Sequence, residues 1–436
     1  MKVLRWLALI IAVPVVFALL VACGGNGSDD VADTADGQET GDRTVVSWAT
    51  WGNEGELDRF FQLNEEFERE FPEIEIDFMP FPNDGYDQRI VTMVAAGTEP
   101  DVFYIEHSFG VLALNGNLEP LDDFLYNDPN ISAEDFFQNL LDNCRINGVL
   151  YALPCDCAPT ALYYNQTMFE ELGLPSPNEL EETGDWDVHA FRDMAVAITE
   201  SGRTAYILED WWSFQFDWIG SSAGNMYPGD GRTVMVNTPE SIAIYEFLQD
   251  MTLNHYIVTT GNPAQVFMSG ELGFVRAGRW LMPVFRDITD FEFDIAPIPR
   301  GLNGGRMVAL PSVPVAMSSN SDVKEAAWEF MAYFHGREGQ TFRLANTGNC
   351  IPSINLPGLD DVVFLNEPVP ANSQIWYQGR AEGYTIYIQN ILHPETLSLW
   401  DDANDAILIG GADVTTTLNA LAESINAILA ESTLLP

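Results

Sequence analysis

The chain of 436 residues exceeds the length at which a single hydrophobic core usually stops growing, so we expect two domains. Its 47% apolar and 12% aromatic residues are enough for packed cores and exclude a disordered or fibrous protein. The 65 Asp and Glu against 19 Lys and Arg give a net charge of −46. No nucleic-acid partner is therefore expected, and any membrane attachment must be covalent or hydrophobic.

The N-terminus has the pattern of a bacterial lipoprotein signal. A short positive region and an apolar run over residues 6–21 lead to Leu-Val-Ala-Cys at 20–23, which matches a lipobox. We expect residues 1–22 to be removed, Cys23 to carry a lipid, and residues 23–43 to form a flexible acidic tether. The alternative is an ordinary secretory signal or a short transmembrane anchor. The lipoprotein interpretation predicts a cell-membrane protein, anchored on the extracytoplasmic side.

Residues 44–105 alternate between strand and helix patterns. Strands are predicted at 44–49, 74–78 and 102–105, with a helix in each interval. Asn53 and Glu56 have the spacing of a capping box at the start of the first helix, and Pro72 ends it. Gly97 is the expected C-cap of the second helix. Strands and helices that alternate in this way predict an α/β layer with a largely parallel sheet.

The rest of the chain continues this pattern. Asn147-Gly148 between two apolar segments predicts a β-hairpin. Further helices are predicted at 191–198, 241–253, 322–334 and 413–429. Asp322 and Glu325 have capping-box spacing before the third of these. We therefore predict an α/β body throughout.

Four cysteines follow the lipobox: Cys144, Cys155, Cys157 and Cys350. An even number in an exported chain favours structural disulfides over reactive thiols. Cys-x-Cys is poor spacing for a zinc site, and the Cys-x-x-Cys of redox enzymes is absent. A direct bond between Cys155 and Cys157 would close a strained ring. We predict disulfides and no metal.

Catalytic and cofactor motifs are absent from the sequence. It has no Gly-x-Ser-x-Gly, no Walker sequence, no Gly-x-Gly-x-x-Gly after a strand and no His-Glu-x-x-His. The five histidines are scattered, and pairs of acids carry no information in so acidic a chain. The sequence thus predicts neither an enzyme nor a cofactor.

Tryptophan is the more informative residue, since the chain has eleven. Trp51 follows the first predicted strand, at the sheet edge where open α/β folds bind ligands. Trp212 and Trp280 lie beside charged residues, and we place them with Trp376 in loops. An aromatic face bordered by carboxylates suits a pyranose ring, while core packing is the alternative role for any single tryptophan.

Several segments together resemble family 1 of the extracellular solute-binding proteins, the maltose-binding-like receptors of sugar ABC importers. Residues 95–102 resemble A-x-G-x-x-P-D-V, and residues 148–154 with 161–165 resemble G-x-x-Y-x-x-P followed by L-Y-Y-N. Residues 267–280 are similar to F-x-x-G-x-x-A-M-x-x-x-G-x-W, and residues 326–330 and 347–352 match a later helix and loop. Five segments in register behind a lipobox make the resemblance specific.

The resemblance implies the periplasmic-binding-protein fold (type II): two lobes, each a mainly parallel sheet flanked by helices, with a ligand cleft between them. Residues 44–155 and 299–348 would form the first lobe, and residues 156–298 and 349–436 the second. Three crossings would join the lobes and act as a hinge. Such a receptor is expected to act as a monomer, to bind a sugar, expected to be an oligosaccharide, and to deliver it to the permease subunits of an ABC importer.

The resemblance also implies site residues. By segment matching, the ligand contacts would be Trp51, Asn53, Glu106, Asp156, Trp212, Phe214, Trp280 and Trp376. Trp280 matches the tryptophan on which relatives stack a sugar. Since residues 155–157 and Cys350 would lie on neighbouring crossings, we expect Cys144 to pair with Cys155 or Cys157, and Cys350 with the other.

Two other functions stay open at this point. A membrane-anchored glycoside hydrolase would also use carboxylates and aromatic platforms. A receptor for another polar solute, such as a polyamine or a polyol, would suit the acidic composition, although scarce basic residues argue against a phosphate group.

Overall fold

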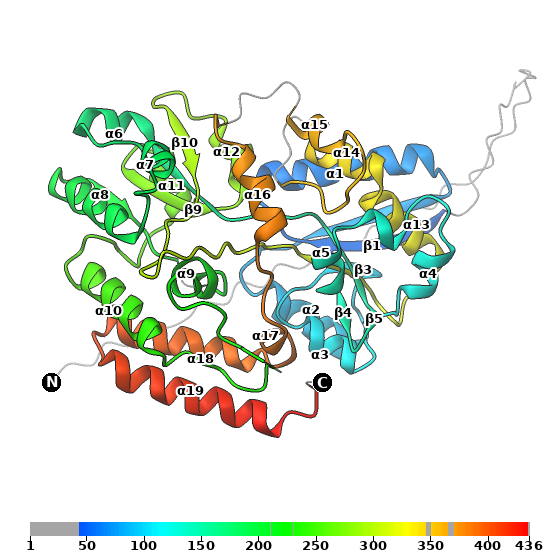
Figure 1. Cartoon of the computed structure of the whole chain (residues 1–436). Helices are drawn as coiled ribbons and strands as arrows, with labels where there is room; N and C mark the ends of the chain where they lie inside the picture. The colour runs from blue at the N-terminus through cyan, green and yellow to red at the C-terminus, as the bar shows by residue number, and fades with distance from the viewer. Residues whose placement is uncertain (1–42, 210, 230, 346–349, 365–369, 435–436) are drawn as a thin grey trace, which may run out of the picture. The chain divides into compact units, whose positions relative to one another are not determined.

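Two β-sheets organise the chain (Figure 1). The computed structural model describes residues 43–434 apart from 210, 230, 346–349 and 365–369. The predicted signal peptide, the lipidation of Cys23 and nearly all of the tether lie outside the described residues. Among the described residues, no helix has the length and apolar character needed to cross a bilayer.

The first sheet has the strand order β2-β1-β3-β11-β6. Its strands are β1 (Thr44–Thr50), β2 (Ile74–Pro80), β3 (Val102–Tyr104), β6 (Ala152–Pro154) and β11 (Pro314–Met317). β1 pairs in parallel with β2 and β3, whereas β11 is antiparallel to β3 and β6. Helices α1 (Glu54–Glu70) and α13 (Lys324–His335) pack on this sheet. We call this sheet and its helices the first lobe.

The second sheet has the order β10-β7-β9-β8. Its strands are β7 (Ala161–Asn165), β8 (Thr204–Tyr206), β9 (Leu272–Ala277) and β10 (Phe293–Ala296). β7 is antiparallel to both neighbours, and only β8 and β9 pair in parallel. The prediction of a mainly parallel sheet is therefore wrong here, because a run of apolar residues does not encode the direction of its strand. We call this sheet and its helices the second lobe.

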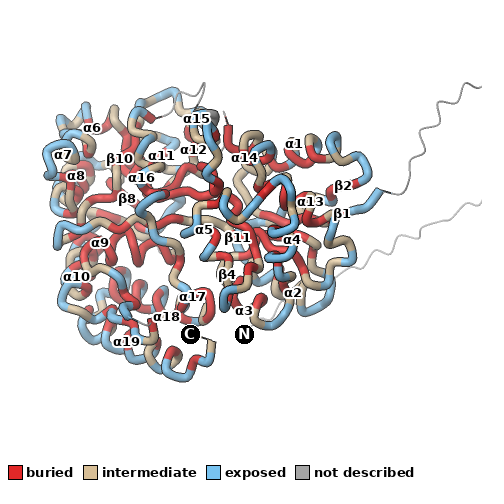
Figure 2. The backbone as a smooth tube through the Cα atoms, turned by 45° about the vertical axis from the view of Figure 1, so that its right-hand side comes forward, coloured by how far each residue is buried: buried red, intermediate tan, exposed pale blue. Residues whose placement is uncertain are grey.

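Helices surround the second sheet and extend the second lobe. α6 (Gln166–Leu172), α8 (Val188–Glu200) and α11 (Pro263–Met268) pack on its strands. α10 (Pro239–Leu253), α18 (Glu395–Asn404) and α19 (Val414–Glu431) lie together in Figure 1. Figure 2 shows exposed outer faces on α10 and α19, while most strands of both sheets are buried and β2, at the edge of the first sheet, is partly exposed.

The remaining elements are short. The α-helices are α2 (Tyr86–Ala96), α3 (Phe109–Leu114), α4 (Asp122–Asn127), α5 (Gln138–Asp142), α7 (Pro177–Thr183), α9 (Ser221–Ala223), α12 (Met282–Phe285), α14 (Arg337–Leu344), α15 (Leu359–Phe364), α16 (Gln374–Glu382) and α17 (Ile388–Leu392). Ala133–Asp135 and Arg279–Leu281 are 3₁₀ turns, and Gln215–Gly220 and Asp405–Ile409 are π-helical. β4 (Arg145–Ile146) and β5 (Val149–Leu150) form a separate hairpin.

Local sequence signals explain several of these boundaries. The capping box of Asn53 and Glu56 is present, and Gly97 caps α2 with a φ of 66°. Asn147 and Gly148 both have positive φ in the turn of the hairpin, as its short loop requires. The predicted capping role of Asp322 is wrong, because Val323 is the N-cap of α13 and has no side-chain cap bond.

Three segments between the two sheets run side by side, and the first two of them join strands of different sheets. We call them the first crossing (155–160), the second crossing (297–313) and the third crossing (350–354). The first and second are joined by backbone bonds from Cys155 to Val313 (2.9 Å), from Ala158 to Pro311 (3.0 Å) and from Thr160 to Ala309 (3.0 Å). Cys157 and Ile351 bond each other through both backbone groups, at 3.0 and 2.9 Å. The three crossings thus form one paired ribbon between the lobes.

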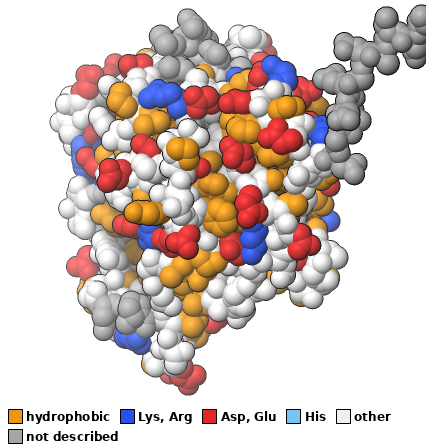
Figure 3. Space-filling model, turned by 90° about the vertical axis from the view of Figure 1, so that its right-hand side faces the viewer, with side chains coloured by type: hydrophobic (Ala, Val, Ile, Leu, Met, Phe, Trp, Pro, Cys, Tyr) orange, Lys and Arg blue, Asp and Glu red, His pale blue; other side chains and the backbone are white. Residues whose placement is uncertain are grey.

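The acidic composition is visible at the surface. On the face shown in Figure 3, carboxylates are spread between apolar and neutral polar side chains and outnumber Lys and Arg. Such a surface keeps a protein soluble and repels anionic polymers.

Candidate ligand-binding site

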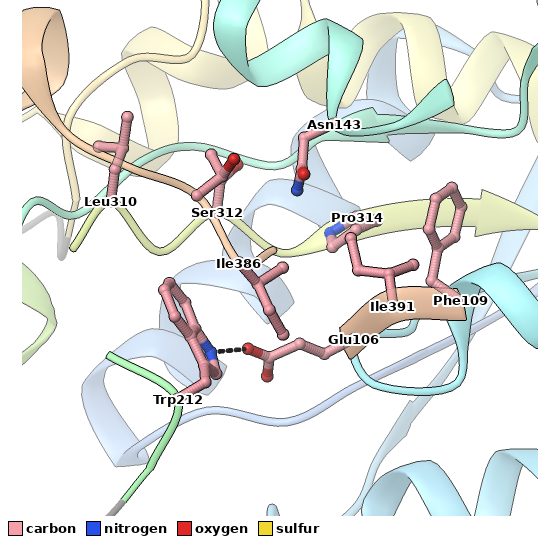
Figure 4. Close-up of a pocket in the computed structure, with 10 residues that line it drawn as sticks. Glu106, Phe109, Asn143, Trp212, Leu310, Ser312, Pro314, Ile386 and Ile391 are labelled. Atoms are coloured by element: carbon pink, nitrogen blue, oxygen red, sulfur yellow. Dashed lines mark hydrogen bonds between the residues drawn. The ribbon is translucent and has the colours of Figure 1, made fainter. Parts of the chain in front are cut away.

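A pocket between the two lobes is lined by residues that follow β3 and β8 in the chain (Figure 4). Its cavity volume is about 10 Å³, room for roughly one water molecule, so the lobes would have to move apart to admit a larger ligand. Its lining residues are Glu106, Phe109, Asn143, Trp212, Leu310, Ser312, Pro314, Thr385, Ile386 and Ile391. We call this the interlobe pocket.

The first lobe contributes Glu106 and Phe109, which follow the carboxyl end of β3. Asp87 in α2 holds this turn, because its carboxylate accepts the backbone N–H of Glu106 at 3.3 Å and that of Ser108 at 2.9 Å. The turn after a sheet strand is where open α/β folds place ligand contacts. The Glu106 carboxylate thus points into the pocket from a fixed backbone (Figure 4).

The second lobe contributes Trp212, from the turn after β8. Its indole Nε1 donates to Oε1 of Glu106 at 2.8 Å, and this bond joins the two lobes across the pocket. The ring packs edge-to-face on Trp211 at 5.2 Å and on Phe216 at 5.8 Å between centroids. Trp212 is only 5% exposed, so its face is held by packing as well as by the hydrogen bond.

The second crossing and the C-terminal part of the chain complete the pocket. Leu310 and Ser312 belong to the crossing, and Ile386 and Ile391 come from the segment around α17. Ser312 Oγ donates to the carbonyl of Asp156 at 2.5 Å, which ties the pocket wall to the first crossing. The wall therefore includes the segments on which a hinge motion would depend.

The chemistry of the pocket is that of a binding site for a neutral, hydroxyl-bearing solute. Among the described lining residues, Glu106 is the one ionisable group and no Lys or Arg occurs. Asn143, Ser312 and Thr385 add neutral donors and acceptors, and the remaining surface is apolar. Because a carboxylate accepts hydroxyl protons and an aromatic face covers C–H groups, this set fits a sugar better than an anion. No group of acids, His and Cys among the described residues has the arrangement of a metal site.

Two predicted site residues, Glu106 and Trp212, lie in the pocket. Trp51 lies outside its lining, half-buried and edge-to-face with Tyr86 and Tyr104 at centroid distances of 4.7 and 5.1 Å. Its role as a ligand contact stays a prediction.

Asn53 and Trp280 form another contact between the lobes. Nδ2 of Asn53 donates to the backbone carbonyl of Trp280 at 3.0 Å. The ring of Trp280 is half-buried and lies edge-to-face with Trp211, 6.0 Å between centroids. Trp280 thus reaches the same aromatic group as Trp212, and its stacking role stays a prediction.

The other three predicted contacts are buried away from the pocket lining. Asp156 pairs with Arg343 at 3.0 Å, so its carboxylate is already neutralised inside the hinge. Phe214 is 1% exposed and packs near Tyr245. Trp376 was expected in a loop but lies in α16, fully buried, because neighbouring apolar residues that are distant in sequence enclose it.

The matching family model covers residues 53–341 and describes the bacterial extracellular solute-binding proteins. The chain belongs to this family. A binding protein of Brucella abortus (strain 2308) is 25% identical over 305 residues, which cover 66% of this chain and 71% of that protein. The melibiose/raffinose/stachyose-binding protein MelE of Bacillus subtilis is 27% identical over 167 residues, or 38% of this chain and 35% of that protein.

A solved structure extends the comparison to the fold. The ABC substrate-binding protein Lmo0181 from Listeria monocytogenes, in complex with cycloalternan, superposes with a TM-score of 0.80 at 17% identity. The match covers 90% of this chain and all of that one. This solute-binding protein therefore has the two-lobed periplasmic-binding fold, and its family places it outside the cytoplasm.

Most of the pocket wall of this solute-binding protein was missed by the sequence analysis. Phe109, Asn143, Ser312 and the C-terminal residues come from segments far apart in the chain, which only the folded crossings bring together. Ser312 lies between β10 of the second sheet and β11 of the first, and no pattern in the sequence marks it as a pocket residue.

The disulfide prediction is wrong: all four described cysteines are free and buried. Cys157 is paired with Ile351 in an antiparallel bridge. Cys350, the neighbour of Ile351 in the chain, therefore points to the opposite side, and Cys157 and Cys350 lie in different apolar clusters. Cys155 Sγ instead lies 2.7 Å from the hydroxyl of Tyr104. Burial raises the pKa of all four thiols, which keeps them protonated and unreactive.

Proposed function

We propose that this solute-binding protein is the receptor of an ABC importer and binds a sugar, with an oligosaccharide as the expected ligand. The observation that carries the proposal is the interlobe pocket, in which Glu106 and Trp212 meet from opposite lobes beside neutral polar groups. The names of MelE and of the cycloalternan complex support a carbohydrate. Opening of the lobes would break this contact, and permease subunits would recognise the closed arrangement.

Two alternatives lead to different experimental results. A glycoside hydrolase needs two carboxyl groups at the scissile bond, but Glu106 is the one acid among the described lining residues. A polyamine would place several positive charges against this single carboxylate, which leaves most of them without a partner. The pocket therefore fits a neutral sugar or polyol better than either.

The ligand class is tested by a thermal-shift screen of neutral mono- and oligosaccharides, polyols, polyamines and sugar phosphates. Ligand at 100 times its Kd stabilises a protein by about 2.7 kcal/mol, which such a screen detects readily. We expect shifts with neutral sugars alone. A shift with polyamines alone would refute the sugar proposal, and chromatography that finds shortened oligosaccharides after incubation would favour a hydrolase.

We also propose that the chain acts as a monomer held to the membrane by a lipid on Cys23, with lobes at 44–155 plus 299–348 and 156–298 plus 349–436. Lipidation is tested by palmitate labelling of the wild type and of Cys23→Ala. We expect label in the membrane fraction for the wild type only, and unchanged ligand affinity in the variant. A labelled variant would exclude Cys23 as the acceptor.

A further inference from the structure

A buried ion pair lies behind the turn that carries Trp212. Arg276 in β9 donates from Nη1 to Oδ2 of Asp217 in the π-helical segment at 2.9 Å, and the two side chains are 1% and 0% exposed. Neither lines the interlobe pocket. Removing two charges from water costs free energy that their attraction often fails to recover. A contribution to the free energy of unfolding is therefore a weak reason for this pair, and its other contacts are more informative.

On one side of this pair, Arg276 holds the turn that leads to the pocket. Its Nη1 donates to Ser213 Oγ at 2.6 Å, and its Nη2 donates to the carbonyl of Glu209 at 3.1 Å. Its guanidinium also lies over the ring of Trp211, 5.5 Å from the centroid. These contacts flank Trp212 on both sides in sequence. One planar group with several donors thus fixes the backbone from which Trp212 reaches Glu106.

On the other side, Asp217 holds two of the three crossings. Its Oδ1 accepts the backbone N–H of Ala309 at 2.7 Å and the hydroxyl of Thr160 at 2.9 Å. Thr160 Oγ1 also lies 3.2 Å from the carbonyl of Ala309. Thr160 belongs to the first crossing and Ala309 to the second. The carboxylate therefore joins both crossings to Arg276.

We propose that Arg276 is a positioning residue for ligand binding, which through Asp217 couples the turn carrying Trp212 to the first and second crossings. The inference rests on the proposed function for its ligand, but the coupling itself is a property of the unliganded chain. Movement of the crossings would shift Asp217, and with it Arg276 and the Trp212 turn. The hinge and one wall of the pocket then move as a unit.

Arg276→Lys tests the coupling with the charge on Asp217 still compensated. A lysine ammonium lacks the planar fork, so it cannot contact Asp217, Ser213 and Glu209 together. We expect faster amide hydrogen exchange in the peptide covering Trp211–Phe214 without ligand, and about 10- to 100-fold weaker affinity for the sugar found by the screen. Unchanged exchange and unchanged affinity would overturn the proposal.

Two further variants separate positioning from stability. Ser213→Ala removes one contact of Arg276 with the turn and leaves the ion pair intact, so it tests the proposal even if Arg276→Lys fails to fold. We expect it to raise exchange in the same peptide, and unchanged exchange there would contradict the coupling. Phe67→Leu is the control for lost stability, because its ring is fully buried in the first lobe against Phe71, Phe330 and Tyr333, none of which lies in a crossing or in the Trp212 turn.

The control should lower the unfolding midpoint without faster exchange in the Trp211–Phe214 peptide. Equal acceleration in Phe67→Leu would show a general loss of stability and overturn the proposal. Amide hydrogen exchange is measured without ligand. The test of the coupling therefore holds even if the sugar proposal fails.

Discussion

The indole nitrogen of Trp212 and the carboxylate of Glu106 lie 2.8 Å apart, although the two residues come from different lobes. Each follows a sheet strand. Asp87 accepts the backbone N–H of Glu106, and Arg276 donates to Ser213 and Glu209, which lie on either side of Trp212 in the chain. A ligand in the pocket would meet both groups at once. The hydrogen bond between Trp212 and Glu106 joins the closed lobes through the same two side chains that would contact the solute.

Glu106→Gln should weaken sugar binding by about 10-fold or more, because hydrogen bonds to a charged acceptor contribute about 1.5–3 kcal/mol. Calorimetric affinity for the best sugar of the screen measures the loss. Glu119→Gln is the control, since Glu119 is in the first lobe but pairs with Lys324 instead of lining the pocket. Equal affinity in Glu106→Gln and wild type would place the ligand elsewhere.

Trp280→Ala should lower affinity by about 30- to 1,000-fold, as loss of an aromatic hot spot typically does, with a small change in the unfolding midpoint. The ring is half-buried and touches the aromatic group of Trp211 and Trp212. Retained affinity with a large drop in midpoint would make Trp280 a core residue instead.

The thiols give a prediction about covalent structure. Denatured, unreduced protein should release four titratable thiols from Cys144, Cys155, Cys157 and Cys350, and the folded protein should release almost none. Burial in apolar surroundings is the cause of this protection. Peptide mapping that recovers disulfide-linked fragments would contradict the free thiols.

His335 predicts a pH dependence of stability. Burial lowers the pKa of its imidazole to about 3, and its Nδ1 lies 2.7 Å from the carbonyl of Met331. An unfolded histidine titrates near 6.5, so below that pH the unfolded chain binds a proton that the folded chain rejects. The free energy of unfolding should thus fall by about 1.4 kcal/mol per pH unit between roughly pH 6.5 and 3 from this group.

Replacement of the ring tests this assignment. His335→Gln should reduce the slope of unfolding free energy against pH by one proton in that window, as measured by chemical denaturation. His189→Gln is the control, because His189 is exposed on α8. An unchanged slope in His335→Gln would show that the buried imidazole is protonated in the folded chain.

The sequence was sufficient for features that depend on local signals. The capping box at Asn53, the Gly97 cap and the Asn147-Gly148 hairpin were all predicted and are confirmed. Glu106 and Trp212 were predicted by segment matching to the solute-binding family, and both lie in the lining of the interlobe pocket. The direction of the strands in the second sheet was not predictable from the sequence. It depends on the side from which the segments between the lobes enter that sheet.

Residues whose partners lie far along the chain were beyond sequence reasoning. Asp156 looked like a free acid until Arg343, 187 residues away, was seen to neutralise it. Trp376 looked like a loop residue until the second apolar cluster closed around it. The pocket residues Ser312 and Ile391 carry no local signal at all, because neutral polar and aliphatic side chains are common everywhere.

The central claim is that a neutral sugar binds in the interlobe pocket without being changed. Its most direct test is isothermal titration calorimetry of the purified chain with the best neutral oligosaccharide from the screen, followed by chromatography of the recovered ligand. We predict saturable binding at one site, loss of affinity in Glu106→Gln, and ligand recovered intact. No binding by any neutral sugar, or recovery of shortened products, would contradict the account.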